Sequence, residues 1–261
     1  MLRLRQICLV APELESTVEQ MQRIFAIAPC HRGAGVAKYG LVNALFVFGH
    51  QFLEIVAPTS GVADDTTAAG RYLQRSKGRG GYMAIFDCDD PERRQTHVTG
   101  LGMRIAHVLN DPGQFWGIQL HPLDTRATML EFDRTTGNET LDGHYWPAGP
   151  DWRAAQRLDL IQGIPLIDIE TANPAGLAEH WRQIIEHPVD TATPDPEMRF
   201  DLGAIRFLRG APDGREHMSQ VHVSVTDPRG VLARAIDCGL PARGAGFDFC
   251  GVTIVAVENA S

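Results

Sequence analysis

A pattern of one strand, one helix and further strands recurs four times along the chain. Three of the four helices begin at an Asp-Pro or Asn-Pro pair, at Asp90, Asn173 and Asp227, and the first begins at the related pair Pro12-Glu13. An Asp or Asn side chain caps a helix start, and the fixed φ of proline suits the first helical turn. A start signal that recurs in this way is typical of a repeated supersecondary unit. The chain is therefore restricted to folds built from copies of a β-α-β-β-β module.

The periodicity of apolar residues places the elements of these modules. In the first half it predicts strands over 2–10, 30–31, 41–48, 51–56, 82–88, 103–108, 115–121 and 128–133, and helices over 13–28, 68–75 and 91–101. In the second half it predicts strands over 158–170, 198–201, 204–209 and 221–226, a closing hairpin over 247–257, and helices that begin at Pro174 and Pro228. Residues 135–153 are rich in Gly, Pro, Asp and Trp, which predicts a linker between an N-terminal domain, 1–140, and a C-terminal domain, 154–261.

The composition narrows the classes of partner. The chain has 261 residues, of which 44% are hydrophobic, and a formal net charge of -8. Such a charge argues against non-specific binding to nucleic acid or to an anionic membrane surface. The 5 cysteines are odd in number and form no C-x-x-C pair, which favours free thiols in a reducing compartment. We therefore expect a cytoplasmic protein, monomer or homodimer, with a small molecule as substrate or ligand.

Two glutamates occupy equivalent places in the first two modules. Glu54 lies in the last strand of the first module, GHQFLEIVAP, and Glu131 lies in the last strand of the second, which ends GIQLHPLDTRATMLEFDR. The same number of positions separates Gln6 from Glu54 and Met83 from Glu131. A carboxylate that is buried in such a strand needs a partner, a metal ion or a proton. The spacing predicts that both carboxylates face a common cleft, whereas the simpler alternative is that both point into solvent.

The fourfold module and the closing pieces QLHPLDTRATMLEF and HQFLEIVAP resemble the vicinal oxygen chelate superfamily, and most closely its methylmalonyl-CoA epimerase and glyoxalase branch. The resemblance implies an α+β fold in which four modules pair into two curved, mostly antiparallel sheets with the helices outside. Metal ligands in this superfamily typically come from the first and last strand of a module, which here are Gln6, Glu54, Met83 and Glu131. The usual His is missing from both first strands, and Met is a poor ligand for a hard ion. The resemblance thus implies at most one divalent ion, held by Gln6, Glu54 and Glu131, and no organic cofactor.

The resemblance implies three alternative functions. The first is a lyase, isomerase or epimerase that acts on a small carbonyl compound, with Glu54, Glu131 and His121 as catalytic residues and with or without the metal ion. The second is a metal-free protein of the bleomycin-resistance type that sequesters a small molecule. The third is an extradiol dioxygenase. Its iron site requires two His and one carboxylate on one face, and only the carboxylates are at the matching positions. The second half lacks an inward carboxylate in its closing strands, so we expect it to be structural or to bind without a metal.

Several residues beside the two glutamates are candidates for substrate contact. Strand alternation places some of them on the predicted cleft face, and the others are large apolar residues at its edge. They are Phe52, Tyr82, Met83, Trp116, Gln119 and Met129. Aromatic residues and Met at such places are more often ordinary packing, and a lone His before Pro is more often a structural hydrogen-bonding residue.

Overall fold

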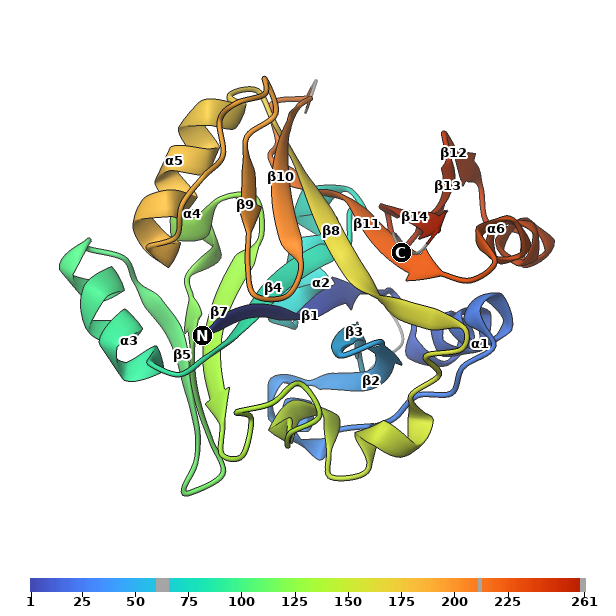
Figure 1. Cartoon of the computed structure of the whole chain (residues 1–261), viewed down its shortest axis with the longest axis horizontal. Helices are drawn as coiled ribbons and strands as arrows, with labels where there is room; N and C mark the ends of the chain where they lie inside the picture. The colour runs from blue at the N-terminus through green and yellow to red at the C-terminus, as the bar shows by residue number, and fades with distance from the viewer. Residues whose placement is uncertain (60–65, 211–212, 259–261) are drawn as a thin grey trace. The chain divides into compact units, whose positions relative to one another are not determined.

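The computed structural model describes residues 1–59, 66–210 and 213–258, which form an α+β fold with two seven-stranded sheets (Figure 1). The first sheet has the order β2-β3-β1-β4-β7-β6-β5 and the second the order β12-β13-β14-β11-β8-β10-β9. The first contains β1 (Leu2–Val10), β2 (Leu41–Phe48), β3 (Gln51–Pro58), β4 (Gly81–Cys88), β5 (Ile105–Asp111), β6 (Phe115–Leu120) and β7 (Met129–Thr135). The second contains β8 (Ile161–Thr171), β9 (Glu197–Arg199), β10 (Ala204–Arg209), β11 (His217–Val225), β12 (Ala242–Arg243), β13 (Gly246–Phe249) and β14 (Val252–Glu258). The predicted fold class, four modules in two sheets, is confirmed.

Each module pairs its first strand in parallel with its last. The pairs are β1 with β3, β4 with β7, β8 with β10 and β11 with β14. A parallel pair requires a crossover connection, and one long helix supplies it in each module. These helices are α1 (Leu14–Phe25), α3 (Pro91–Gly100), α5 (Pro174–Ile185) and α6 (Pro228–Asp237). The last strand of each module has a paired strand on both sides in its sheet.

Helix α1 shows how the local sequence sets these elements. The side chain of Glu13 caps its start by accepting from the backbone N–H groups of Glu15 and Ser16. The helix buries an apolar stripe that includes Val18 and Phe25. It ends at Ala26, whose left-handed backbone has a φ of 56°, and not at the proline further on, because that conformation already stops the helical ladder.

Three local predictions need correction. The strand predicted over 30–31 is only a single bridge between His31 and Leu45. A short helix, α4 (Pro122–Thr125), interrupts the predicted β6–β7 loop. The predicted linker contains the turns η2 (Trp146–Ala148) and η3 (Trp152–Ala155), and Trp152 is fully buried. Its Gly and Pro content concealed the buried aromatic residues, which composition alone does not weigh.

The described residues divide into two compact units. The first unit comprises Met1–Arg5, Met83–Trp146 and Leu166–Ser219, and the second comprises Gln6–Tyr82, Pro147–Pro165 and Gln220–Ser261. The predicted division into domains 1–140 and 154–261 stays a prediction. No helix in the described ranges is long and apolar enough to cross a membrane.

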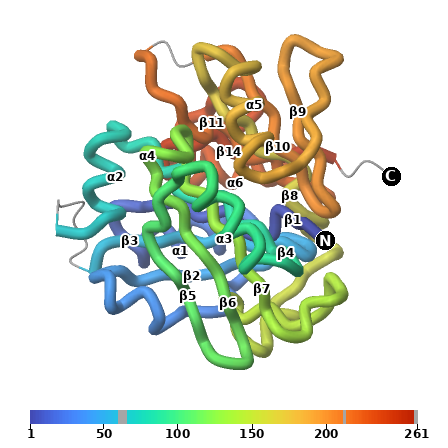
Figure 2. The backbone as a smooth tube through the Cα atoms, turned by 90° about the vertical axis from the view of Figure 1, so that its left-hand side faces the viewer, coloured from blue at the N-terminus to red at the C-terminus, as the bar shows by residue number. Residues whose placement is uncertain are grey.

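Each unit brings two helices together. In the first unit, Arg94 of α3 donates to the backbone oxygen of Ile185 in α5 at 2.7 Å, and strands β5, β6 and β7 run side by side (Figure 2). In the second unit, α1 and α6 lie side by side (Figure 1), and Arg234 of α6 donates to the backbone oxygen of Ile24 at 2.7 Å. Helices from the first and fourth modules thus share one unit, and helices from the second and third share the other.

Candidate functional site

In the second unit, Glu54 lies at the centre of three paired strands. Across β1 it faces Cys8, and across β2 it faces Leu45. Its side chain is only 7% exposed. Gln6 of β1, one diagonal step away, donates from Nε2 to Oε2 of Glu54 at 2.9 Å. The predicted neighbours Gln6 and Glu54 are therefore brought together by the parallel register of β1 and β3.

Asn43 of β2 completes this cluster, and the sequence analysis missed it. Its Nδ2 donates to Oε1 of Glu54 at 2.6 Å, and its Oδ1 accepts from the backbone N–H of Gly33 at 2.8 Å. It is buried and lies diagonally across the β2–β3 pair from Glu54, where side chains interact. A polar residue within the apolar run of LVNALFVF was the signal that could have identified it.

The surroundings of Glu54 favour its protonated form. Burial raises the pKa of Glu54 above its ordinary value, while hydrogen bonds from Asn43, Cys8 and Gln6 lower it without cancelling the rise. The groups that oppose this rise in pKa are neutral hydrogen-bond donors. A buried carboxyl group in such surroundings can take up and release a proton nearer to neutral pH than an exposed one.

Aromatic side chains pack on the same part of the second unit. Phe52, on the same face of β3 as Glu54, is fully buried, and its ring meets Trp152 edge-on with centroids 5.3 Å apart. The ring of Tyr82 lies 4.9 Å from that of Tyr72. Burial raises the pKa of Tyr82, and the charges of Cys8 and Glu54 raise it further. Phe52 and Tyr82 therefore belong to the surroundings of Glu54, and Phe52 is covered by a residue of the predicted linker.

In the first unit, Glu131 occupies the equivalent place in β7. It is 4% exposed, and Gln119, its register partner on β6, donates from Nε2 to its Oε2 at 2.8 Å. Met83 and Met129 are also register partners, on β4 and β7, and both are buried. Four of the predicted residues thus lie together on one face of this unit.

Asp133 follows Glu131 on the same face, and the sequence analysis missed it as well. It is 0% exposed, and neither of its carboxyl oxygens has a hydrogen-bond partner within the described residues. Burial raises the pKa of Asp133 well above its ordinary value, the charges of Glu131 and Asp87 raise it further, and Arg5 lowers it. Alternation along GIQLHPLDTRATMLEFDR could have found it, because Glu131 and Asp133 are two positions apart.

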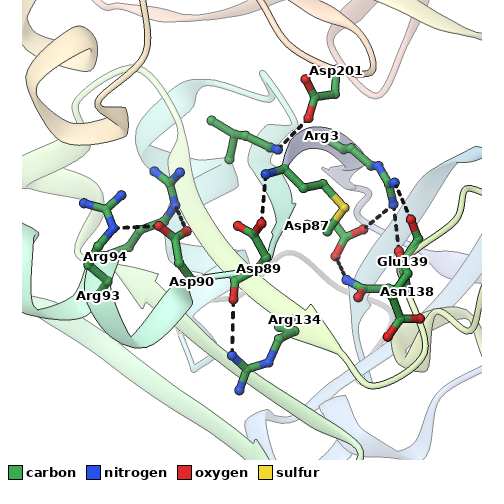
Figure 3. A network of polar contacts seen from close by, with 12 residues as sticks. Arg3, Asp87, Asp89, Asp90, Arg93, Arg94, Arg134, Asn138, Glu139 and Asp201 are labelled. Atoms are coloured by element: carbon green, nitrogen blue, oxygen red, sulfur yellow. Dashed lines mark hydrogen bonds and ion pairs between the residues drawn. The ribbon is translucent and has the colours of Figure 1, made fainter.

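Asp87 is the register partner of Asp133. Unlike Asp133, it has side-chain hydrogen-bond partners for its carboxyl group (Figure 3). Asn138 donates to it, and Nη1 of Arg3 lies 3.5 Å from its Oδ2. The same Arg3 nitrogen donates to the backbone oxygen of Asn138 at 2.9 Å. Burial nevertheless raises the pKa of Asp87 to about 6, against the opposing effect of Arg5.

Two of the predicted site residues lie apart from these clusters. His121 is the N-cap of α4, where its Nδ1 accepts from the backbone N–H of Leu123 at 3.3 Å. Trp116 is the register partner of Arg134, so it lies on the opposite face of the sheet from Gln119 and Glu131. Trp116 therefore does not join Glu131, and a catalytic role for His121 stays a prediction.

The described part of the second half also contains a buried carboxylate. Asp168 of β8 is fully buried, and Arg206, its register partner on β10, donates to both of its carboxylate oxygens at 2.8 and 3.0 Å. A bidentate pair of this kind compensates the burial of a carboxylate. The expectation that this half is structural, or binds without a metal, stays a prediction.

The donor atoms of each unit, taken by itself, do not fit a divalent ion. Within the described residues, no group of three His, Cys, Asp or Glu side chains is placed to hold a metal. In the second unit, the two predicted ligands Gln6 and Glu54 are bonded to each other through an amide N–H. A hard ion requires oxygen atoms turned toward it. The full predicted set also includes Glu131 of the other unit, so it stays a prediction.

Comparison with known proteins assigns the family. Residues 7–185 match the glyoxalase-like domain family. The chain belongs to this family. No curated protein sequence matches this glyoxalase-like protein. The predicted resemblance, which named glyoxalase-like proteins within the vicinal oxygen chelate superfamily, is confirmed by this match.

Several solved structures of more distant proteins are similar to this chain. A hypothetical protein from Staphylococcus aureus is 9% identical, with a TM-score of 0.67 over 99% of this glyoxalase-like chain and 100% of its own. A variant of 4-hydroxymandelate synthase from Streptomyces coelicolor is 12% identical, with a TM-score of 0.60 over 91% of this chain and 75% of its own. Methylmalonyl-CoA epimerase from Streptomyces coelicolor is 18% identical over 51% of this chain and 97% of its own, with a TM-score of 0.44.

Proposed function

We propose that this glyoxalase-like protein is a lyase or isomerase that moves a proton next to the carbonyl group of a small molecule. The observation that carries the proposal is the state of Glu54. It is buried, its pKa is raised, and side-chain donors hold both of its oxygens. A carboxyl group with these properties is suited to general acid–base catalysis, because its pKa lies closer to the working pH.

Glu131 is the second acid–base residue in this proposal. It is buried, and Gln119 fixes one of its oxygens. A carboxyl group held in this way can remove or return a proton within its own unit. The chemistry proposed for the two glutamates needs no metal ion.

Deuterium exchange tests the proposal even when the product has not been identified. The protein is incubated in D2O with a panel of small oxo-acids, hydroxy-ketones and acyl thioesters, and loss of the α-proton is followed by NMR. We expect exchange with at least one class of compound, and a loss of about 100-fold or more in Glu54→Gln and Glu131→Gln. Glu19→Gln, an exposed change on α1, is the matched control. Unchanged exchange in both site variants would overturn the proposal.

A second candidate function is metal-free sequestration of an aromatic or amphipathic molecule. The pairs Phe52–Trp152 and Tyr72–Tyr82 favour it, since they place four aromatic rings in the same unit as Glu54. Tight binding of such a compound that a chelator does not change, without any α-proton exchange, would support this function over the first. The dioxygenase alternative gains no support from either unit, because it needs a His-containing triad and the described residues place none.

A further inference from the structure

The orientation of the Asn43 amide is fixed by the backbone. Its Oδ1 lies 2.8 Å from the backbone N–H of Gly33, which can only donate. The carbonyl end of the amide must therefore face Gly33, and the NH2 end must face Glu54. Oε1 of Glu54 is thus held as an acceptor, at 2.6 Å from Nδ2 of Asn43.

Gly33 allows this close approach. A Cβ at Gly33 would lie 3.3 Å from Oδ1 and 3.4 Å from Nδ2 of Asn43, which is tighter than ordinary contact. Asn43 is itself buried in β2, so its rotamer is confined by the sheet as well as by Gly33. The amide is therefore placed by groups that do not depend on Glu54.

The other oxygen of Glu54 is also engaged. Nε2 of Gln6 donates to Oε2 at 2.9 Å, and the thiol of Cys8 hydrogen-bonds to the same carboxyl group. A divalent cation binds to lone pairs of oxygen, and it is repelled by the protons of an amide NH2 group. Two amides that turn their N–H groups toward one carboxylate occupy the positions that ligand oxygens would need.

We propose that Asn43 is a positioning residue that holds Glu54 as a hydrogen-bonded carboxyl group and keeps divalent metal ions away from it. Asn43 would act through Glu54 and need not touch a substrate. The inference goes beyond the proposed function, because it holds whether or not Glu54 moves a proton.

A cobalt(II) titration tests this role by visible absorption, which reports ligands bound to the ion. We expect no cobalt(II) band above that of the free ion in the wild-type protein. Asn43→Asp replaces the donated N–H by a second carboxylate beside Glu54, and two adjacent carboxylates favour a bridging cation. We expect this variant to bind cobalt(II) at least about 10-fold more tightly than the wild type, a typical effect of changing the group that orients a ligand. Adding Glu54→Gln should abolish the gain.

Control variants separate the expected gain in cobalt(II) affinity from the effects of added charge and of misfolding. Asn110→Asp adds a carboxylate at an exposed position and should leave cobalt(II) binding unchanged. Asn43→Ser removes the donated N–H without adding charge, and it should change affinity in the same direction if Asn43→Asp does not fold. Either of two results overturns the inference: a wild-type cobalt(II) band that Glu54→Gln removes, or no gain in any folded Asn43 variant. Neither cobalt(II) result depends on turnover. A failure of this inference can therefore be told apart from a failure of the proposed function.

Discussion

The ring of Trp152 packs edge-on against Phe52, with centroids 5.3 Å apart. Phe52 belongs to β3, and Trp152 belongs to a segment that the sequence presents as a linker. Just after this segment, Gln156 donates to the backbone oxygen of Gly49 at 2.7 Å. This part of the chain is therefore built into the second unit beside Glu54.

Removal of the Trp152 side chain should measure this packing. Trp152 is 1% exposed, and we expect Trp152→Ala to lower the free energy of unfolding by about 3–5 kcal/mol, because a large cavity forms in a closely packed region. Urea unfolding followed by circular dichroism provides the measurement. Trp146, which is 37% exposed, is the matched control, and Trp146→Ala should cost less. Equal costs for the two variants would contradict a structural role for Trp152.

Asp133 should make stability depend on pH. Its pKa is raised in the folded protein, so it stabilises the fold fully only below its unfolded pKa near about 4, and this contribution is lost as the pH rises through the folded pKa. In Asp133→Asn this loss is absent. The stability of the variant relative to the wild type should therefore increase above about pH 4, by up to about 1.4 kcal/mol for each pH unit.

A surface aspartate provides the contrast to Asp133. The pKa of Asp159 is lowered by hydrogen bonds from Arg157, so its contribution is present above the unfolded pKa and lost as the pH falls. Asp159→Asn should therefore keep a constant stability difference from the wild type in the same urea series between about pH 4 and neutral pH, unlike Asp133→Asn, because Asp159 is ionised in both the folded and the unfolded state over that range. Parallel curves for the wild type and Asp133→Asn would show that Asp133 is ionised in the folded protein.

Position 117 should not tolerate even the methyl side chain of alanine. It is the register partner of Asp133, and a Cβ at Gly117 would lie 2.9 Å from the Cβ of Asp133. We expect Gly117→Ala to lower the free energy of unfolding by about 1–3 kcal/mol through overpacking. Gly35→Ala is the control, because nothing lies within 4 Å of its added Cβ, and its effect should be about 0.5 kcal/mol or less. If Gly117→Ala had the same unfolding midpoint as the wild type, β6 would be able to move away from Asp133.

Two substitutions separate capping from catalysis at His121. If its role is to cap α4, His121→Ala should cost about 1 kcal/mol, and His121→Asn, which retains a capping side chain, should cost less. Thermal unfolding measures both variants. In the α-proton exchange assay, a catalytic role predicts that both lose activity, whereas a capping role predicts that His121→Asn retains it.

Much of the fold follows from local patterns. The strands β1, β2 and β10 have the bounds that period-two alternation predicts, and α5 and α6 begin at the Asn-Pro and Asp-Pro pairs. The equal separations of Glu54 from Gln6 and of Glu131 from Met83 also identified the two glutamates in the last strands. These features succeed because one residue's backbone preference and the spacing of its near neighbours suffice to produce them.

Local sequence pattern alone does not predict which residues make up a candidate site. Asn43 lies in a strand that the sequence predicts correctly, yet nothing in that strand says that its amide will meet Glu54. The register of β2 against β3 decides that contact. Asp133 was passed over for a related reason, since its isolation depends on what β4 and β6 place around it.

The sequence by itself determined the four modules, the order of their strands and helices, and the two glutamates in their last strands. Tertiary structure alone decided that Glu54 is held by Asn43 and Gln6, that Asp133 is buried without a hydrogen-bond partner among the described residues, and that Trp152 covers Phe52. The physical reason is the range of the interactions. Periodicity and capping act between residues a few positions apart, whereas these contacts join residues that only strand pairing and packing bring within reach.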